Sequence, residues 1–258
     1  MVVQTLCDDL VAETDALTDI VKEFSDEQWL QPTVAEGWDT LETILHLGAT
    51  DLACYMAVDD PVAFGSLRES LAKGEISVHD APGIEVREKS GPKLWEWFIE
   101  GRTQMVEALR KLDPKQRIVW LGPEIGALSL ATSRLLETWT HSHDIADTFG
   151  RSYPQTDRLR HIAHIGFVTR AFSYVNRGLA APSEPVRVEL DAPSGETWVW
   201  GPEESANSVT GSAYEFCKVV TRRTPVADSR LEIQGELAWQ WMEIAQPWIE
   251  PPRISDQA

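Results

Sequence analysis

Apolar residues recur at helical spacing through most of the first 180 residues. Over residues 3–30 they stand three and four positions apart with acidic residues between them, which predicts an amphipathic helix that ends before Pro32. Asp39 and Glu42 have the spacing of a capping box, so we expect the next helix to cover 40–58. The same spacing predicts further helices at 93–112, 128–149 and 157–180. Residues 61–91 are mixed, and we expect a short helix within a long connection there. The succession of long helices favours a helical bundle.

The pattern changes near residue 182. Residues 186–190 alternate between apolar and polar, and a Ser-Gly turn separates them from a second short apolar run at 197–200, which predicts a β-hairpin. Shorter elements are expected afterwards, namely a strand at 231–233 and helices near 212–221 and 236–245. We therefore predict an α+β protein, with a helical domain at 1–182 and a small α+β domain at 183–258.

Charge and hydropathy exclude several classes of function. The chain has 258 residues and a formal net charge of −18, so its surface should repel nucleic acid phosphates and anionic membranes. It contains no apolar run of about 18 residues, which a transmembrane helix would need. We therefore expect no nucleic acid and no membrane among its partners.

The cysteines indicate a reducing compartment. Cys7, Cys54 and Cys217 are odd in number and form no CxxC pair, so we expect three free thiols that act as small apolar residues. The first residues lack the basic segment of a signal peptide. Both features predict a cytoplasmic protein.

The helix at 128–149 carries the strongest candidate for chemistry. Glu137 and His141 are four residues apart, so they share one helix face at a distance that suits two ligands of one divalent ion. His46 lies between two leucines on another helix and supplies a third ligand if the two helices face each other. Three protein ligands and one open position are typical of a catalytic zinc site. The alternatives are a solvated helix face for the stripe that includes Asp144, and a hydrogen-bonded core histidine for His46.

Two further residues compete for the metal. His143 lies about 200° around the helix from His141, so the two cannot face one ion. Glu42 precedes His46 by four residues, but we favour its capping role over a ligand role. Histidine and glutamate ligands suit zinc, and also nickel, manganese or iron.

These residues resemble a known family. A Gly-Trp pair before the second helix, His46 within it and Glu137-x-x-x-His141 on a later helix resemble the DinB/YfiT-like superfamily of metal-binding bundles. The continuation through Asp144 and the C-terminal α+β segment resemble, more specifically, the mycothiol-dependent maleylpyruvate isomerase family of actinobacteria. The resemblance implies a DinB-like up-and-down four-helix bundle, followed by a small α+β domain. It also implies a zinc ion held by His46, Glu137 and His141, with an open position for water or a thiol, and mycothiol as the thiol cofactor.

The resemblance also implies an arginine of the C-terminal domain near the carboxylates of the substrate. Arg222 matches it, with Arg223 as the alternate, although the segment Phe216–Arg223 lacks the Trp-Gly pair that precedes the arginine in the family. An arginine that interacts with the dipole of a helix C-terminus is the alternative interpretation of Arg222. Asp144 has three interpretations, as an orienting partner of a ligand, a contact of the thiol cofactor, or a solvated residue.

The leading hypothesis is a zinc-dependent isomerase or thiol S-transferase that acts on a small electrophilic, anionic substrate. Zinc would lower the pKa of the thiol, and the thiolate would add to an electrophilic carbon. The alternatives are a zinc-dependent hydrolase and a non-catalytic metal-binding, ligand-binding or regulatory protein. Both a monomer and a homodimer are compatible with the sequence.

Overall fold

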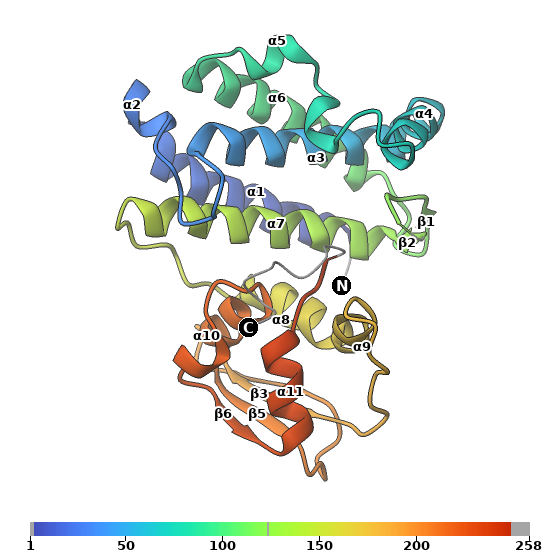
Figure 1. The fold of residues 1–258 in the computed structure, drawn as a ribbon, viewed down its shortest axis with the longest axis vertical. Helices are drawn as coiled ribbons and strands as arrows, with labels where there is room; N and C mark the ends of the chain where they lie inside the picture. Colours follow the sequence, from blue (N-terminus) through green and yellow to red (C-terminus); the bar gives the residue numbers. More distant parts are fainter. Residues whose placement is uncertain (1–2, 123, 249–258) are drawn as a thin grey trace. The chain divides into compact units, whose positions relative to one another are not determined.

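The computed structural model describes residues 3–122 and 124–248 (Figure 1). The chain divides into two compact units, residues 1–153 and 154–258. The first unit is mainly helical with one two-stranded sheet, and the second combines helices with a four-stranded sheet, so the predicted α+β class is confirmed. No helix among the described residues is long and apolar enough to cross a membrane. All three cysteines are free and buried, as predicted.

Four long helices form the bundle of the first unit, as Figure 1 shows: α1 (Val3–Val21), α3 (Thr40–Asp59), α6 (Gly91–Arg110) and α7 (Ala127–Thr148). Helix α1 packs against α6 and α7, and α3 packs against the same two helices. Their apolar faces bury residues such as Leu17, Ile44, Phe98 and Ile145, and removing this surface from water is the main force that holds the bundle together. Shorter elements connect the helices, namely α2 (Asp26–Trp29), α4 (Pro61–Ala72), η1 (Val78–Asp80), α5 (Ile84–Arg87), β1 (Arg117–Ile118) and β2 (Ile125–Gly126).

Capping residues set where the first helices begin. The helix predicted over 3–30 is two helices, because Ser25 and Gln28 form a capping box that starts α2 after α1 has ended. The predicted capping box of α3 is confirmed. The backbone N–H of Glu42 donates to Asp39 Oδ1 over 2.8 Å, and the N–H of Asp39 donates to Glu42 Oε2 over 3.1 Å. This cap fixes the start of α3 and hence the height of His46 in the bundle.

A buried network of ion pairs and hydrogen bonds links all four long helices. Both oxygens of Asp51 on α3 accept hydrogen bonds, Oδ2 from Arg102 Nε on α6 over 2.6 Å and Oδ1 from Arg134 Nε on α7 over 3.2 Å. The same guanidinium groups donate to Thr14 over 2.8 Å and to Thr50 over 2.6 Å. The network fixes the register of α3, α6 and α7, because each charge depends on a partner from another helix.

The second unit contains a mixed four-stranded sheet in the order β4-β3-β5-β6. Its strands are β3 (Arg187–Asp191), β4 (Thr197–Trp200), β5 (Ser208–Ser212) and β6 (Glu232–Gln234). The predicted hairpin is the antiparallel pair β3–β4. The sequence analysis missed β5, which pairs in parallel with β3, because its serines and Gly211 give little strand signal. The helices of this unit are α8 (Leu159–Val168), α9 (Arg170–Val175), α10 (Ala213–Val220), η2 (Val226–Asp228) and α11 (Glu236–Ile244).

The segment predicted as one helix at 157–180 is two helices, α8 and α9, which meet at Thr169. The hydroxyl of Thr169 donates to the carbonyl of Ile165 over 2.7 Å at the end of α8. Helix α8 packs against α10 and α9 against α11, so both belong to the second unit. The division after residue 153 therefore differs from the predicted boundary at 182. Residues 249–258 of the predicted second domain lie outside the described residues.

Candidate metal centre

The three predicted metal ligands converge in the first unit. His46 on α3 and Glu137 and His141 on α7 each present one ligand atom, and these atoms lie within 4.8 Å of one another. Glu137 Oε2 is 3.0 Å from His46 Nε2 and 3.5 Å from His141 Nε2. We call these three residues the candidate metal centre. One carboxylate and two imidazoles in this arrangement fit a divalent ion and leave a position for a further ligand.

Local structure explains the convergence. Glu137 and His141 are one turn apart on the same face of α7, and α3 packs beside α7 and brings His46 to them. The carboxylate of Glu42 is engaged with the backbone of Asp39, so Glu42 has the capping role that the sequence favoured over a ligand role.

Asp144 is buried behind the candidate metal centre. It is 2% exposed, and its Oδ2 lies 3.0 Å from Nδ1 of His141. Thr148 lies one turn later on α7. Its hydroxyl donates to the carbonyl of Asp144 and accepts from the N–H of Val34, so it is also engaged within the protein. The stripe through Asp144 and Thr148 is therefore not a solvated face. A carboxylate at the second nitrogen of a ligating histidine is the usual way to orient it toward a metal.

Hydrogen bonds shift the proton affinities of the centre in opposite directions. Burial alone would raise the pKa of Glu137, but hydrogen bonds from His141 and His46 outweigh burial and hold this pKa well below 4.5. Burial alone would lower the pKa of His141, but hydrogen bonds to Asp144 and Glu137 raise it above 6.5. The metal-free site thus favours a carboxylate beside an imidazolium, and a cation at the centre would replace that proton.

The indole of Trp38 covers two of the ligands. Its ring is stacked on His141 with centroids 5.3 Å apart and planes 17° apart, and it is inclined to the ring of His46 at 4.8 Å and 53°. Trp38 follows Gly37, whose φ of 82° lies in the left-handed region. The sequence analysis used the Gly-Trp pair as a family feature and did not assign Trp38 to the site. Its place directly before the helix of His46 was the available signal.

His143 belongs to a different environment. It is buried, with Nδ1 3.0 Å from the carbonyl of Trp139, and its ring lies 4.1 Å from the ring of Trp139 and 4.4 Å from that of Tyr153. It is not among the clustered ligand atoms, which agrees with its predicted place on another face of α7.

Arg222 and Arg223 follow α10 in the second unit. Arg222 has a φ of 61°, the only positive value among the described residues that are not glycine, and its Nη1 donates to the carbonyl of Glu243 over 3.5 Å. Arg223 Nη1 donates to the carbonyl of Thr221 over 2.8 Å, and the guanidinium lies 5.9 Å from the ring of Trp248. Both arginines therefore contact carbonyls at the C-terminus of a helix, because Glu243 lies in the last turn of α11 and Thr221 is the C-terminal cap of α10, which is the alternative interpretation given for Arg222. The left-handed conformation of Arg222 belongs to the end of α10, where the N–H of Arg222 donates to the carbonyl of Val219 over 2.9 Å and the N–H of Arg223 donates to that of Lys218 over 2.8 Å.

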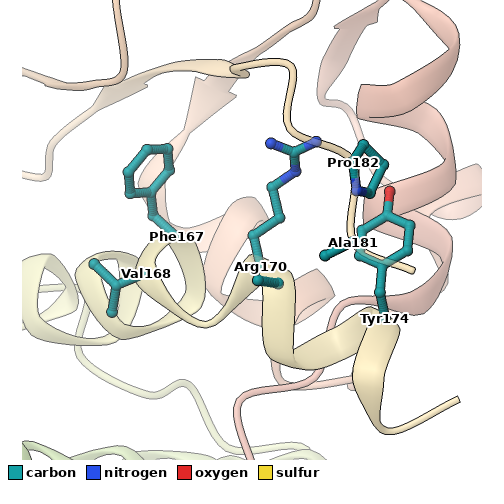
Figure 2. A pocket seen from close by; sticks show the side chains of 7 residues that line it. Phe167, Val168, Arg170, Tyr174, Ala181 and Pro182 are labelled. Carbon is teal, nitrogen blue, oxygen red and sulfur yellow. The ribbon is translucent and has the colours of Figure 1, made fainter. Parts of the chain in front are cut away.

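The second unit also has a pocket of its own, with a volume of about 350 Å³ (Figure 2). Figure 2 shows the guanidinium of Arg170 between the side chains of Phe167 and Tyr174, with Pro182 nearby. Arg170 Nη1 donates to the carbonyl of Glu184 over 2.8 Å. The lining is mainly apolar, and one cation faces it.

Comparisons with protein families find two matches in this chain. Residues 10–146 match the model described as the mycothiol maleylpyruvate isomerase N-terminal domain. Residues 182–231 match the model described as wyosine base formation. The first match contains all three residues of the candidate metal centre and Asp144.

Relatives and solved structures cover nearly the whole chain. Two uncharacterized proteins from two strains of Mycobacterium tuberculosis are 38% identical over 244 residues, which is 95% of this chain and 95% of each relative. A crystal structure of the mycothiol-dependent maleylpyruvate isomerase is similar with a TM-score of 0.52 and 17% identity. A mutant of that isomerase gives 0.55 and 15%. Each alignment covers 90% of this chain and 93% of the other. At this identity the likeness concerns the fold.

Proposed function

Because the chain belongs to the family of the mycothiol maleylpyruvate isomerase N-terminal domain, we propose that it is a zinc-dependent enzyme that uses mycothiol as its thiol cofactor. Its reaction is isomerisation or thiol transfer on a small electrophilic, anionic substrate. The observation that carries the proposal is the convergence of His46, Glu137 and His141, with one carboxylate oxygen 3.0 Å and 3.5 Å from the two imidazole nitrogens.

The residues of the chain have separable roles in this proposal. His46, Glu137 and His141 hold the ion, and Asp144 keeps Nδ1 of His141 in a hydrogen bond so that Nε2 is free for the ion. When bound there, zinc supplies a Lewis acid that lowers the pKa of a thiol and makes thiolate available near neutral pH. The burial of Asp144 supports this orienting role over direct contact with the cofactor.

The proposed chemistry is addition of the thiolate to an electrophilic carbon. The sulfur forms a bond to carbon, and the electron pair displaced from the carbon–carbon double bond moves toward the carbonyl of the substrate. Rotation about the resulting single bond and loss of the thiolate give an isomer, whereas protonation without loss of the thiol gives a thioether. Arg222 is proposed to bind the carboxylate of the substrate by paired hydrogen bonds, with Arg223 as the alternate.

Metal content of the untagged protein tests the first half of the proposal. Plasma mass spectrometry should find about one zinc per wild-type chain, and His141→Ala should lose it. His143→Ala is the matched control, because it removes a buried histidine of the same helix that contacts Trp139 instead of the candidate metal centre. Wild-type protein that takes up no metal even when zinc is offered would refute the proposal and favour a non-catalytic binding protein.

Dependence on a thiol tests the second half. The zinc-loaded protein is incubated with a panel of unsaturated and epoxide-bearing carboxylates, with and without mycothiol. Turnover that requires mycothiol supports the proposal. Hydrolysis of amides or esters without any thiol would instead identify a zinc hydrolase.

A further inference from the structure

Trp38 contacts both histidines of the candidate metal centre although it offers no metal ligand of its own. Its indole is nearly parallel to the imidazole of His141, with 17° between the planes, and the same indole meets the ring of His46 at 53°. The two imidazoles meet each other edge to face, with centroids 4.8 Å apart. The three rings therefore form one packed group around the nitrogen atoms that face Glu137.

The loop that carries Trp38 is closed by its own hydrogen bonds. The backbone N–H of Thr33 donates to the carbonyl of Trp38 over 2.7 Å, and the N–H of Trp38 donates to the carbonyl of Ala35 over 3.1 Å. Just outside this turn, the N–H of Thr40 donates to the carbonyl of Gln31 over 3.3 Å. Gly37 supplies the positive φ that the turn requires. The indole thus projects from a fixed base directly before α3.

The same loop is attached to α7 beside the candidate metal centre. The N–H of Val34 donates to the hydroxyl of Thr148 over 2.9 Å, and that hydroxyl donates to the carbonyl of Asp144 over 2.7 Å. The loop of Trp38 is therefore attached to both helices that carry the candidate ligands. It continues directly into the start of α3, and the hydrogen bond between Val34 and Thr148 attaches it to α7.

His141 consequently has two restraints that act in different directions. The hydrogen bond to the carboxylate of Asp144 fixes where Nδ1 of His141 points. That hydrogen bond alone leaves the ring able to tilt, because the second side-chain torsion of histidine has a broad energy minimum. The face of the indole of Trp38 blocks this tilt. For His46, the rings of Trp38 and His141 act together as the restraint.

We propose that Trp38 is a positioning residue of the metal centre. Its indole holds the imidazoles of His46 and His141 with their Nε2 atoms toward Glu137, and it closes one side of the centre to water. The proposal rests on the proposed function, because it assumes that these three residues bind a metal. It predicts that loss of the indole weakens metal binding and lets additional water reach the ion.

Cobalt(II) is the probe that separates these effects without any activity assay. It suits the same ligands as zinc, and its visible absorption is strong in four-coordinate sites and weak when more ligands bind. Wild type, Trp38→Ala and Trp38→Phe are loaded with cobalt and then mixed with excess chelator. Trp239→Ala is the matched control, because Trp239 is 43% exposed on α11 of the second unit.

We expect Trp38→Ala to bind cobalt about 10- to 100-fold more weakly, to release it correspondingly faster and to absorb more weakly than wild type. Trp38→Phe should restore part of each property, because it retains a flat ring. Trp239→Ala should match wild type.

The outcomes distinguish this proposal from the one it rests on. If wild type binds cobalt and Trp38→Ala matches it in affinity, release and spectrum, the positioning role is wrong and the metal centre stands. If wild type binds no cobalt, the metal centre itself is refuted, and the role of Trp38 with it. Circular dichroism checks folding, and if Trp38→Ala loses helicity, Trp38→Leu decides the question, because leucine fills space without a flat ring.

Discussion

Nδ1 of His141 lies 3.0 Å from Oδ2 of Asp144, one turn later on the same helix. The carboxylate is 2% exposed, so the hydrogen bond is shielded from water. When a buried carboxylate accepts a hydrogen bond from one nitrogen of a histidine, the other nitrogen points away from it. Here the other nitrogen of His141, Nε2, points toward Glu137 and His46. The pair therefore sets the direction of Nδ1 of His141, while the indole of Trp38 stacks on the face of the same ring.

Replacing Asp144 by alanine should weaken zinc binding about 10- to 100-fold, because the orienting partner of a ligand is lost while all three ligands remain. Competition with a fluorescent zinc chelator measures the change. If Asp144 instead contacts the thiol cofactor, zinc affinity will stay at the wild-type value and only the affinity for mycothiol will fall.

The sequence predicted the cluster of His46, Glu137 and His141 because the spacing of these residues is local or strongly marked. Glu137 and His141 are related by helix periodicity alone, and His46 stood out between two leucines. The capping box of Asp39 and Glu42 was also visible, since it depends on residues three apart. Features that depend on contacts within four or so residues are accessible without a structure.

Features that depend on distant contacts were not predictable in the same way. Asp51 and its two arginine partners are far apart in the sequence, and each alone resembles a surface charge. Strand β5 is specified by its parallel pairing with β3 more than by its own small residues. The contact of Trp38 with His141 spans more than 100 residues, although the sequence placed both on the helical domain.

Replacing Asp51 by alanine should destabilise the protein by about 3–5 kcal/mol, because two buried guanidinium groups lose their shared carboxylate. Urea unfolding followed by circular dichroism measures the change. Asp59→Ala is the matched control on the same helix, where an exposed carboxylate accepts a hydrogen bond from Tyr55, and it should change stability by less than about 1 kcal/mol. Equal effects from both variants would show that the network contributes no more than a surface charge.

Two glycines of α6 should respond to alanine in opposite directions. A Cβ at Gly91 would lie 2.1 Å from Cγ of Trp29, whereas a Cβ at Gly101 would meet nothing within 4 Å. Gly91→Ala should therefore cost about 1–3 kcal/mol through overpacking against a buried ring. Gly101→Ala should stabilise by about 0.5–1 kcal/mol, because alanine loses less backbone entropy in a helix. Thermal unfolding of both variants gives the signs, and the same sign for both would contradict the packing at Trp29.

In the metal-free protein, the ionised side chains of Glu137 and His141 should stabilise the folded state most strongly at mildly acidic pH. The pKa of Glu137 is depressed in the folded state, so its contribution is present above 4.5 and is lost as the pH falls toward the folded value. The pKa of His141 is raised, so its contribution is present below 6.5 and is lost as the pH rises through the folded value. Both contributions coexist between 4.5 and 6.5. Unfolding with a chelator present, compared between wild type and Glu137→Gln, should show the largest difference in that window.

Metal affinity should increase as the pH rises, because a protonated His141 cannot bind the ion. A plot of the logarithm of the zinc dissociation constant against pH should bend at the pKa of His141 in the metal-free protein, which lies above 6.5 because Asp144 and Glu137 stabilise the imidazolium. Asp144→Asn removes the charge that contributes to this stabilisation, so its bend should move to lower pH even though its affinity at high pH is weaker. A bend at the same pH in both proteins would show that Asp144 does not set the proton affinity of His141.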